Sequence, residues 1–402
     1  MISVAEAILK VEAETSILSP ESVAIANACH RFLAEDVIAD SDLPPFDRSQ
    51  MDGYAVRATD TENAPVQLQI VGESAAGNGW HQEMKSGEAV RIMTGAPLPT
   101  GADSVQQVEL TRDLSFEIVE IQKPVPVGRS IVTRGSEVKR GATVLRTGEQ
   151  INPAMLATLA SFGYANVKVG RRPRVTVLAT GSELVAVNEQ PGPDQIRDSN
   201  NYSIGSYAEL AGAQVERLPL AGDDVELLKR QINEAAQRSE VVVTSGGVSM
   251  GVYDFTKAAL KELDCEIFFE RVALRPGKPT VFARLPNGTL VFGLPGNPVS
   301  VSVTFNLFAR TAILKLQGAK QSRLIEEHAI LAQDVKGAEG RESYLPAILS
   351  TDTEGRLIVE ALKWGGSSDF VAFTRASALL IIGAGVEKEA AGSVVRVVNL
   401  PG

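Results

Sequence analysis

The sequence predicts a multidomain α/β plus β protein, with a central doubly wound α/β domain, two small β modules and a helical N-terminal region. Three observations lead to this prediction. The chain has 402 residues, which is too long for one typical domain. Strand and helix patterns alternate after residue 171, and short β-branched runs flank this region on both sides.

The N-terminal part, residues 1–44 together with 141–170, is predicted to be a helical and linker subdomain. Its apolar positions follow helical spacing at Val4, Ala7, Ile8 and Val11. Pro153 suits the first turn of a second helix. Residues 45–140 read instead as a β module, because VQLQIVG, AVRIMTG, FEIVEIQ and SIVTRG are short, β-branched and separated by Gly, Pro and Asn turns.

Residues 171–319 alternate between the two kinds of pattern. RVTVLAT, VERLPLA and EVVVTS are typical of strands, and the segments between them are typical of helices, so a parallel, doubly wound sheet is expected. TVFARL and TLVFGL flank an Asn-Gly turn and predict a hairpin. A long helix should begin at Asn297-Pro298. Residues 320–402 contain five further strand-like runs and form a last β module.

Composition limits the classes of function. Asp and Glu number 49 against 39 Lys and Arg, a net charge of -10, which argues against broad binding of nucleic acid or a membrane surface. The two cysteines and three histidines are scattered and lack metal-site spacing. The start resembles an amphipathic helix rather than a signal peptide, and no apolar run approaches a membrane span, so a cytoplasmic protein is expected.

Two glycine-rich turns are the most informative local feature. VVVTSGG and VFGLPGN each place such a turn after an apolar run, and backbone N–H groups in such turns can bind an anion. Ligands of open parallel sheets bind beyond the carboxyl ends of the strands. The residues expected to bind ligand there are Thr180, Gly181, Ser182, Ser245, Gly246, Gly247, Pro295, Gly296 and Asn297.

Charged residues lie near these turns. Glu183, Asp223 and Asp254 together have the chemistry to bind Mg²⁺, although carboxylates stabilised at helix N-termini explain the same positions. Arg271, Arg275 and Lys278 form a basic cluster suited to an oxyanion, although a solvated strand end is the alternative. The segments around Asp52 and Thr94 read, on their own, only as turns.

Several motifs occur in order along the chain: PPFDRSQMDGYAV, RIMTGAPLPTGADSV, LATGSELV, QIRDSNN, VVVTSGGVSMGVYDFTK, LRPGKPTVF and LPGNPVSVSVTF. Together they resemble the molybdopterin molybdenumtransferase family, which includes bacterial MoeA and the E domain of gephyrin, over essentially the whole chain. The resemblance implies insertion of molybdate into adenylylated molybdopterin with release of AMP and with a divalent cation, Mg²⁺. It also implies a MogA-like central domain and a homodimer.

The resemblance assigns residues by motif. The catalytic set would be Asp52, Thr94, Glu183, Asp223, Asp254, Arg271, Arg275, Lys278, Arg341 and Ser367. Glu183, Asp223 and Asp254 would hold the metal. The substrate-binding set would gain Asp198, Ser199, Asn200, Ser249 and Pro298. Each active site of the homodimer would be shared between subunits, and a molybdopterin adenylyltransferase and molybdoenzymes would be partners.

The sequence departs from the family where Arg271 and Arg275 occupy positions at which lysine is common. An arginine keeps the charge but cannot act as a proton donor or base, so any role there is electrostatic. With no Ser, Cys or His nucleophile evident, positioning and electrostatics should dominate the mechanism. Two alternatives remain open: an adenylyltransferase that makes the activated pterin, and a gephyrin-like scaffold whose last module binds peptides.

Overall fold

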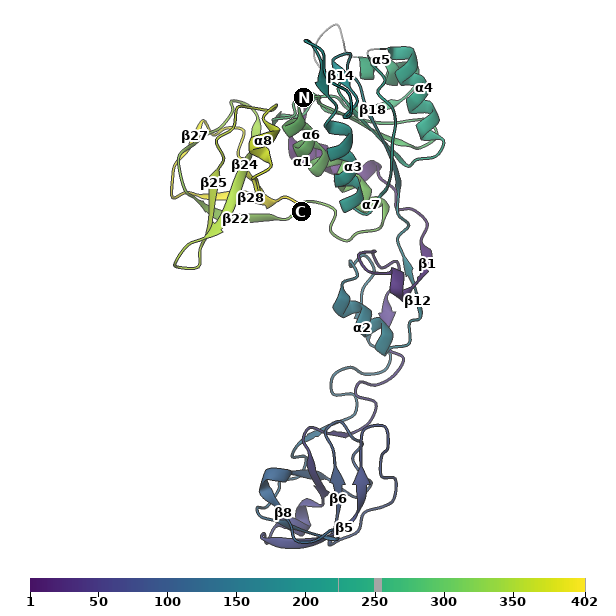
Figure 1. Ribbon diagram of the computed structural model, residues 1–402, viewed down its shortest axis with the longest axis vertical. Coiled ribbons are helices and arrows are strands. Elements are labelled where there is room, and N and C mark those ends of the chain that lie inside the picture. Colours follow the sequence, from purple (N-terminus) through teal and green to yellow (C-terminus); the bar gives the residue numbers. More distant parts are fainter. Residues whose placement is uncertain (223, 249–254, 402) are drawn as a thin grey trace. The chain divides into compact units, whose positions relative to one another are not determined.

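The computed structural model describes residues 1–222, 224–248 and 255–401 (Figure 1). The chain forms two compact units. Unit 1 comprises Met1–Glu35, Thr147–Leu156 and Asn166–Gly402, and unit 2 comprises Asp36–Arg146 and Ala157–Ala165. Both units are therefore assembled from segments that are separate in the sequence.

Unit 1 contains a central six-stranded sheet in the order β16 (Gln214–Arg217), β13 (Arg174–Ala179), β17 (Val241–Ser245), β21 (Leu290–Leu294), β20 (Val281–Arg284) and β18 (Glu266–Phe269). The first four strands are parallel, and β20 runs antiparallel to both of its neighbours, β21 and β18. The hairpin predicted at the Asn-Gly turn is confirmed as β20–β21. Because this hairpin reverses direction, the sheet is mixed rather than wholly parallel.

Helices cover both faces of this sheet, as a doubly wound fold requires. One core contains Val241 and Val243 together with side chains of α1 (Val4–Glu14), α3 (Asn200–Leu210) and a long helix. This long helix runs from α6 (Pro298–Thr304) through a π-helical turn, η4 (Phe305–Ala309), into α7 (Arg310–Leu316). α4 (Val225–Ala236) and α5 (Phe255–Glu262) share the opposite core with Val242. The alternation of consecutive valines between the two cores is the period-2 pattern of a strand buried on both faces.

The helix Pro298–Leu316 is long and apolar enough to cross a membrane by length and composition alone, contrary to the expectation from sequence. Within the molecule, however, 89% of its apolar window is buried. Its side chains pack in the core of the central domain, as those of Phe305, Phe308 and Ile313 do. A buried core helix explains its composition, so it is weak evidence for a membrane span.

In the predicted helical N-terminal region, the helix at the start of the chain and the helix at Pro153 are confirmed, but the segment between α1 and residue 44 is not helical apart from one short 3-10 turn. A capping box at Ser3 and Glu6 begins α1 as the spacing indicates. The helix ends at Glu14, where β-branched Thr15 and then Pro20 oppose its continuation. The following segments form β1 (Glu21–Ala24), η1 (Ile25–Asn27), β2 (Val37–Ile38), β11 (Thr143–Leu145), α2 (Pro153–Ser161) and β12 (Asn166–Val169).

The C-terminal part of unit 1 is a small closed barrel. Its strands follow the order β24 (Glu342–Thr351), β25 (Leu357–Ala361), β22 (Glu326–Leu331), β28 (Val394–Asn399) and β26 (Ala378–Ile382), and β26 pairs again with β24. The five strand-like runs predicted here are confirmed. A short strand from the central domain, β19 (Leu274–Arg275), adds to β24 and joins the two parts by a backbone ladder.

Unit 2 is built on a six-stranded sheet in the order β7 (Ser104–Gln107), β4 (Gly53–Val56), β6 (Glu88–Ile92), β5 (Val66–Ser74), β9 (Ile118–Ile121) and β8 (Thr111–Asp113). A separate pair joins β3 (Arg48–Ser49), which precedes β4 in the sequence, to the distant β10 (Ile131–Val132). The predicted β character of this region is confirmed. Apolar side chains pack on both faces, in one cluster around Tyr54 and another around Ile92.

Candidate functional site

The carboxyl ends of β13, β17 and β21 bring the two predicted glycine turns together. Thr180 N donates to Ser245 O over 2.8 Å, and Gly246 N donates to Leu294 O over 3.1 Å. A Cβ atom on Gly296 would lie 3.8 Å from Gly246 Cα, so the turns are direct neighbours. Gly246 has φ +93, and a Cβ atom there would lie 2.3 Å from Thr180 O. Glycine is therefore required for this close approach of the strand ends.

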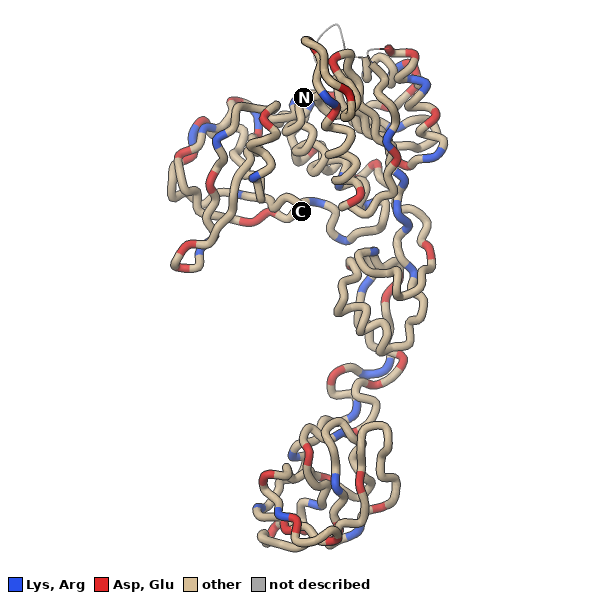
Figure 2. The backbone as a smooth tube through the Cα atoms, viewed as in Figure 1, with Lys and Arg blue, Asp and Glu red and all other residues tan. Residues whose placement is uncertain are grey.

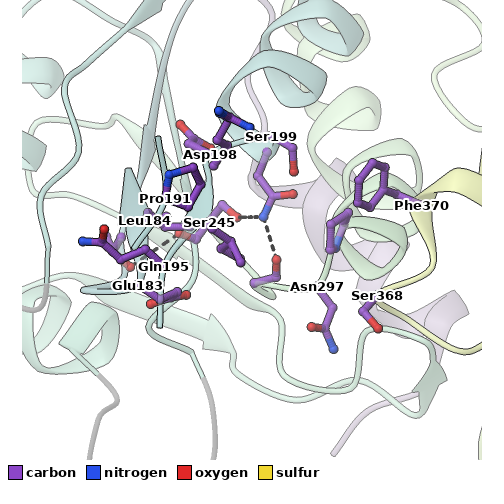
Figure 3. Close-up of a pocket in the computed structure, with 16 residues that line it drawn as sticks. Glu183, Leu184, Pro191, Gln195, Asp198, Ser199, Ser245, Asn297, Ser368 and Phe370 are labelled. Carbon is purple, nitrogen blue, oxygen red and sulfur yellow. Dashed lines mark hydrogen bonds between the residues drawn. The ribbon is translucent and has the colours of Figure 1, made fainter. Parts of the chain in front are cut away.

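A cavity of about 570 Å³ opens beyond these strand ends (Figure 3). In that view Leu184, Pro191 and Gln195 lie on one side of the cavity, and Ser368 and Phe370 lie on the other. Nine of the predicted site residues line it: Thr180, Glu183, Asp198, Ser199, Asn200, Ser245, Gly296, Asn297 and Pro298. Gly181, Ser182, Gly246 and Gly247 belong to the same turns but are not among the lining residues.

The carboxylates expected to hold a metal are only partly placed. Glu183 lies on the rim of the cavity and is exposed. Asp223, Asp254 and the predicted ligand-binding Ser249 lie outside the described residues. Over residues 1–222, 224–248 and 255–401, no group of three His, Cys, Asp or Glu side chains is arranged to hold a metal ion. The cation site consequently stays a prediction.

A second cavity, of about 490 Å³, contains most of the predicted basic cluster. Arg275, Lys278, Arg341 and Ser367 line it, together with Pro295 and Asn297 from the second glycine turn. None of the three cationic side chains forms an ion pair with a described carboxylate, whereas acidic and basic residues are interspersed over both units (Figure 2). Three unpaired cations around one cavity of an acidic chain provide a site for an oxyanion.

Asn297 lines both cavities, so the two adjoin at the second glycine turn. The segment 364–370 from the C-terminal barrel supplies lining residues to each cavity. It is fixed to the start of α6 because Asn297 Nδ2 donates to Ser367 Oγ over 2.7 Å and Val299 N donates to Ser367 O over 3.0 Å. The arrangement can hold two ligands, one of them anionic, next to each other.

Arg271 does not line the basic cavity. Its backbone carbonyl accepts a hydrogen bond from Ile2 N, and its Nε is buried without a partner among the described groups. It lies near Glu270, where the Lys257 ammonium and then Arg271 hold the pKa of the glutamate carboxyl below its usual value. The prediction that Arg271 acts with Arg275 and Lys278 has no support from this geometry.

Asp52 and Thr94 are brought together in unit 2. Asp52 Oδ1 accepts hydrogen bonds from Thr94 N over 2.7 Å and from Thr94 Oγ1 over 2.9 Å. These two bonds hold the pKa of the Asp52 carboxyl below its usual value. The pair is exposed, so its ionised carboxylate is available to a ligand.

The Asp-Gly sequence at 52–53 is not simply a turn. Gly53 begins β4, and a Cβ atom there would lie 1.9 Å from Gln106 O on β7. The next residue, Tyr54, is fully buried and donates to Asp113 Oδ1 over 2.5 Å. Arg91 pairs with the same carboxylate and lies over the Tyr54 ring. Asp52 therefore sits at the start of a firmly anchored strand.

Some lining residues were missed by sequence reasoning. Trp364 contributes to the basic cavity, and Pro191, Gln195 and Phe370 contribute to the other. The tryptophan before Gly365-Gly366 was a usable signal, since tryptophan combines a large apolar surface with an N–H donor and is enriched at interfaces. Of the other three, Gln195 begins the QIRDSNN motif, Pro191 lies in a loop without a motif, and Phe370 begins the short helix α8 (Phe370–Phe373).

Family models cover most of the chain. Residues 2–163 match the MoeA N-terminal region (domain I and II), residues 176–315 match a probable molybdopterin binding domain, and residues 328–400 match the MoeA C-terminal region (domain IV). A solved structure of a molybdopterin biosynthesis MoeA protein from Pyrococcus horikoshii OT3 has a TM-score of 0.85 at 28% identity, covering 99% of this chain and 100% of that one.

Curated relatives agree along the full length. The molybdopterin molybdenumtransferase of Haemophilus influenzae is 38% identical over 90% of this chain and 89% of its own. That of Bacillus subtilis is 35% identical over 94% and 89%, and that of Staphylococcus aureus strain Mu50 is 34% identical over 99% and 95%. Fold and cavities define a multidomain α/β enzyme with adjoining ligand and oxyanion sites. The chain belongs to the molybdopterin molybdenumtransferase (MoeA) family, whose members act in molybdenum cofactor biosynthesis.

Proposed function

We propose that this protein is a transferase that inserts molybdenum from molybdate into adenylylated molybdopterin and releases AMP. The observation that carries the proposal is the pair of adjoining cavities that share Asn297. The cavity at the glycine turns accepts the pterin nucleotide. The cavity lined by Arg275, Lys278 and Arg341 attracts molybdate. Adjoining sites place the two substrates next to each other, which lowers the barrier by positioning.

The residues act by binding and electrostatics. Arg275, Lys278 and Arg341 stabilise the oxyanion, and Ser367 supplies a hydroxyl to the same cavity. Thr180, Ser245 and the residues of the two glycine turns contact the pterin nucleotide. Ser245 is not a nucleophile in this proposal, because its hydroxyl already donates to Pro295 O over 3.3 Å.

Magnesium is part of the proposal. Carboxylate oxygens are the ligands that Mg²⁺ prefers, and Glu183 presents an exposed carboxylate at the rim of the nucleotide cavity. Asp223 and Asp254 would complete the set. The bound cation would offset phosphate charge as the nucleotide leaves.

Asp52 and Thr94 are proposed to complete the site from the first β module of a second subunit, in a homodimer. Their support is the exposed, ionised carboxylate of Asp52, which within the described residues accepts hydrogen bonds from Thr94 alone. The matching cellular role is that of a cytoplasmic enzyme. It would receive its substrate from a molybdopterin adenylyltransferase and deliver the cofactor to molybdoenzymes.

The test is a defined reaction. Purified protein is mixed with adenylylated molybdopterin, molybdate and Mg²⁺, and the products are assayed for AMP and for cofactor that activates an apo-molybdoenzyme. The proposal expects both products, each dependent on molybdate. Consumption of ATP and free molybdopterin, with no AMP formed from the adenylylated pterin, would show an adenylyltransferase instead.

A further inference from the structure

Asn200, the first residue of α3, joins the two glycine turns. Its side chain is 9% exposed and lines the nucleotide cavity. Asn200 Nδ2 donates to Ser245 Oγ over 2.8 Å and to Gly296 O over 2.6 Å, and both bonds are drawn as dashed lines beside Ser245 in Figure 3. Because a carbonyl can only accept, the amide nitrogen must be the atom that faces Gly296.

Together Asn200 and Ser245 hold two successive carbonyl groups. Ser245 Oγ donates to Pro295 O, and Asn200 Nδ2 donates to Gly296 O. In a planar trans peptide the N–H points opposite to the C=O of the same unit. Drawing the carbonyls of Pro295 and Gly296 toward the strand ends therefore turns the N–H groups of Gly296 and Asn297 the other way.

These two N–H groups are free to bind a ligand. Neither Gly296 N nor Asn297 N donates to an acceptor within the described part of the chain, and both residues are exposed. Two adjacent backbone N–H groups with the same direction bind an oxyanion well. Asn297 also lines both cavities, so the pair lies where the two proposed substrates meet.

Asn200 leaves one buried polar atom unsatisfied, and the two hydrogen bonds that its amide donates explain why this unfavourable residue is present. Its Oδ1 is buried and has no hydrogen-bond partner among the described groups. A buried, unsatisfied acceptor is unfavourable, and an apolar side chain of similar size would avoid it. No such side chain can donate to both Ser245 and Gly296.

We propose that Asn200 is a positioning residue that directs the N–H groups of Gly296 and Asn297 at a tetrahedral oxyanion of the substrates. The inference rests on the proposed function. The oxyanion is either the phosphate of the nucleotide or molybdate, and separate titrations distinguish them.

The test measures binding by calorimetry with AMP, adenosine and molybdate as separate probes. In Asn200→Ala, affinity for AMP should fall about tenfold or more, since hydrogen bonds to a charged group are misdirected. Affinity for adenosine should not change, because it has no phosphate. A loss confined to molybdate would assign the N–H pair to the basic cavity.

Asn200→Asp keeps the shape but removes both donors, and it carries the test if the alanine variant fails to fold. Its affinity for AMP should also be weak near neutral pH. Protonation of the introduced carboxyl restores one O–H donor, so the aspartate variant should recover affinity on acidification relative to the wild type. A general loss of stability would produce no such recovery.

Asn201→Ala is the matched control. Asn201 is adjacent, is also buried and also has an unsatisfied Oδ1. Its amide, however, donates to Leu218 O, and it does not line the nucleotide cavity. Its affinity for AMP should match the wild type. Three results would each overturn the inference. They are an equal loss of AMP affinity in both alanine variants, wild-type affinity of Asn200→Asp for both AMP and molybdate, and a loss of adenosine affinity in Asn200→Ala as large as the loss for AMP. Failure of the wild type to bind AMP would instead count against the proposed function itself.

Discussion

Arg275 contributes to the site through its backbone and its side chain. The backbone lies in β19, which pairs with Ser343 of the barrel, and Nη1 donates to Gly337 O over 3.3 Å. These contacts hold the guanidinium at the wall of the basic cavity beside Lys278 and Arg341. A fixed cation is worth more to an oxyanion than a mobile one, because less conformational entropy is lost on binding.

Reversal of this charge should be severe. Arg275→Glu places a carboxylate against the oxyanion, and molybdate affinity should fall about a hundredfold or more, while Arg275→Lys keeps the charge and should retain substantial affinity. Calorimetry with molybdate measures both. Arg356→Glu, at an exposed turn of the same barrel, makes the same change in net charge and should bind normally. Normal binding by Arg275→Glu would refute the assignment.

Asp52 makes the stability of its unit depend on pH. Because Thr94 holds the folded-state pKa of Asp52 below 3.8, the carboxylate is favoured in the folded state. This stabilisation is complete above the unfolded-state pKa and is lost as the pH falls through the folded-state pKa. Asp52→Ala should therefore lower the Tm of unit 2 at neutral pH, with a difference from wild type that shrinks on acidification. Calorimetry at decreasing pH tests this, and a difference that grows on acidification would contradict it.

Residue types predicted much of the site, but not its geometry. The glycines and cations were identified because their chemistry is local and distinctive. Gly296 and three of the four cations line one of the two cavities, whereas Gly181, Gly246 and Gly247 form the turns beside them. Arg271 was grouped with Arg275 by proximity in the sequence and by the family resemblance, but Arg275 lines the basic cavity and Arg271 does not. Phe370 was missed because it begins the one-turn helix α8 (Phe370–Phe373), whose sequence does not reveal which surface it will face.

Among the elements, β4 shows how a strand can depend on one glycine. The strand pairs with β7, and Gln106 O lies too close to Gly53 for any side chain. Gly53→Ala must displace one strand, and it should lower the Tm of unit 2 by several degrees or prevent its folding. Thermal unfolding tests this. Gly385→Ala, which has open space around its added methyl group, is the control and should melt like the wild type.

Strands were predicted better than helix lengths. The β-branched runs of unit 2, the central sheet and the barrel all appear as strands, because their pattern is strong over short windows. The helical prediction for the N-terminal region extended beyond Glu14, because helical spacing alone takes no account of Pro20 or of the pairing of β1 with residues 166–169. Pairing between distant segments is a tertiary effect that a local window cannot contain.

At the scale of the whole molecule, each unit is discontinuous in sequence. Residues 147–156 belong to unit 1, although their neighbours on both sides belong to unit 2. Composition does not change at these boundaries, so sequence patterns alone do not reveal them. The length of the chain indicated several modules, and the structure forms two compact units. The apolar helix Pro298–Leu316 shows that composition must be interpreted together with packing.

A shared active site makes a prediction about mixed dimers. If Asp52 acts on the Glu183 site of its partner, Asp52→Ala and Glu183→Ala should each be inactive alone. A verified heterodimer of the two variants contains one site with both changes and one site with neither, so it should regain about half of the wild-type activity. Cofactor formation by differently tagged, co-purified subunits measures this. Complete inactivity of such heterodimers would place both residues in a site within one chain.

The short strand β19 has a consequence for exchanging modules between relatives. The barrel is a separate segment in sequence, yet Leu274 and Arg275 of the central domain form part of its ladder. A chimera cut at residue 320 would join a foreign barrel to a native β19. Any mismatch in the pairing of β19 with that barrel would displace Arg275, a cation of the basic cavity. A recombinant that keeps its function must therefore take residues 274–275 and the barrel from the same parent, so β19 and the barrel should be inherited together.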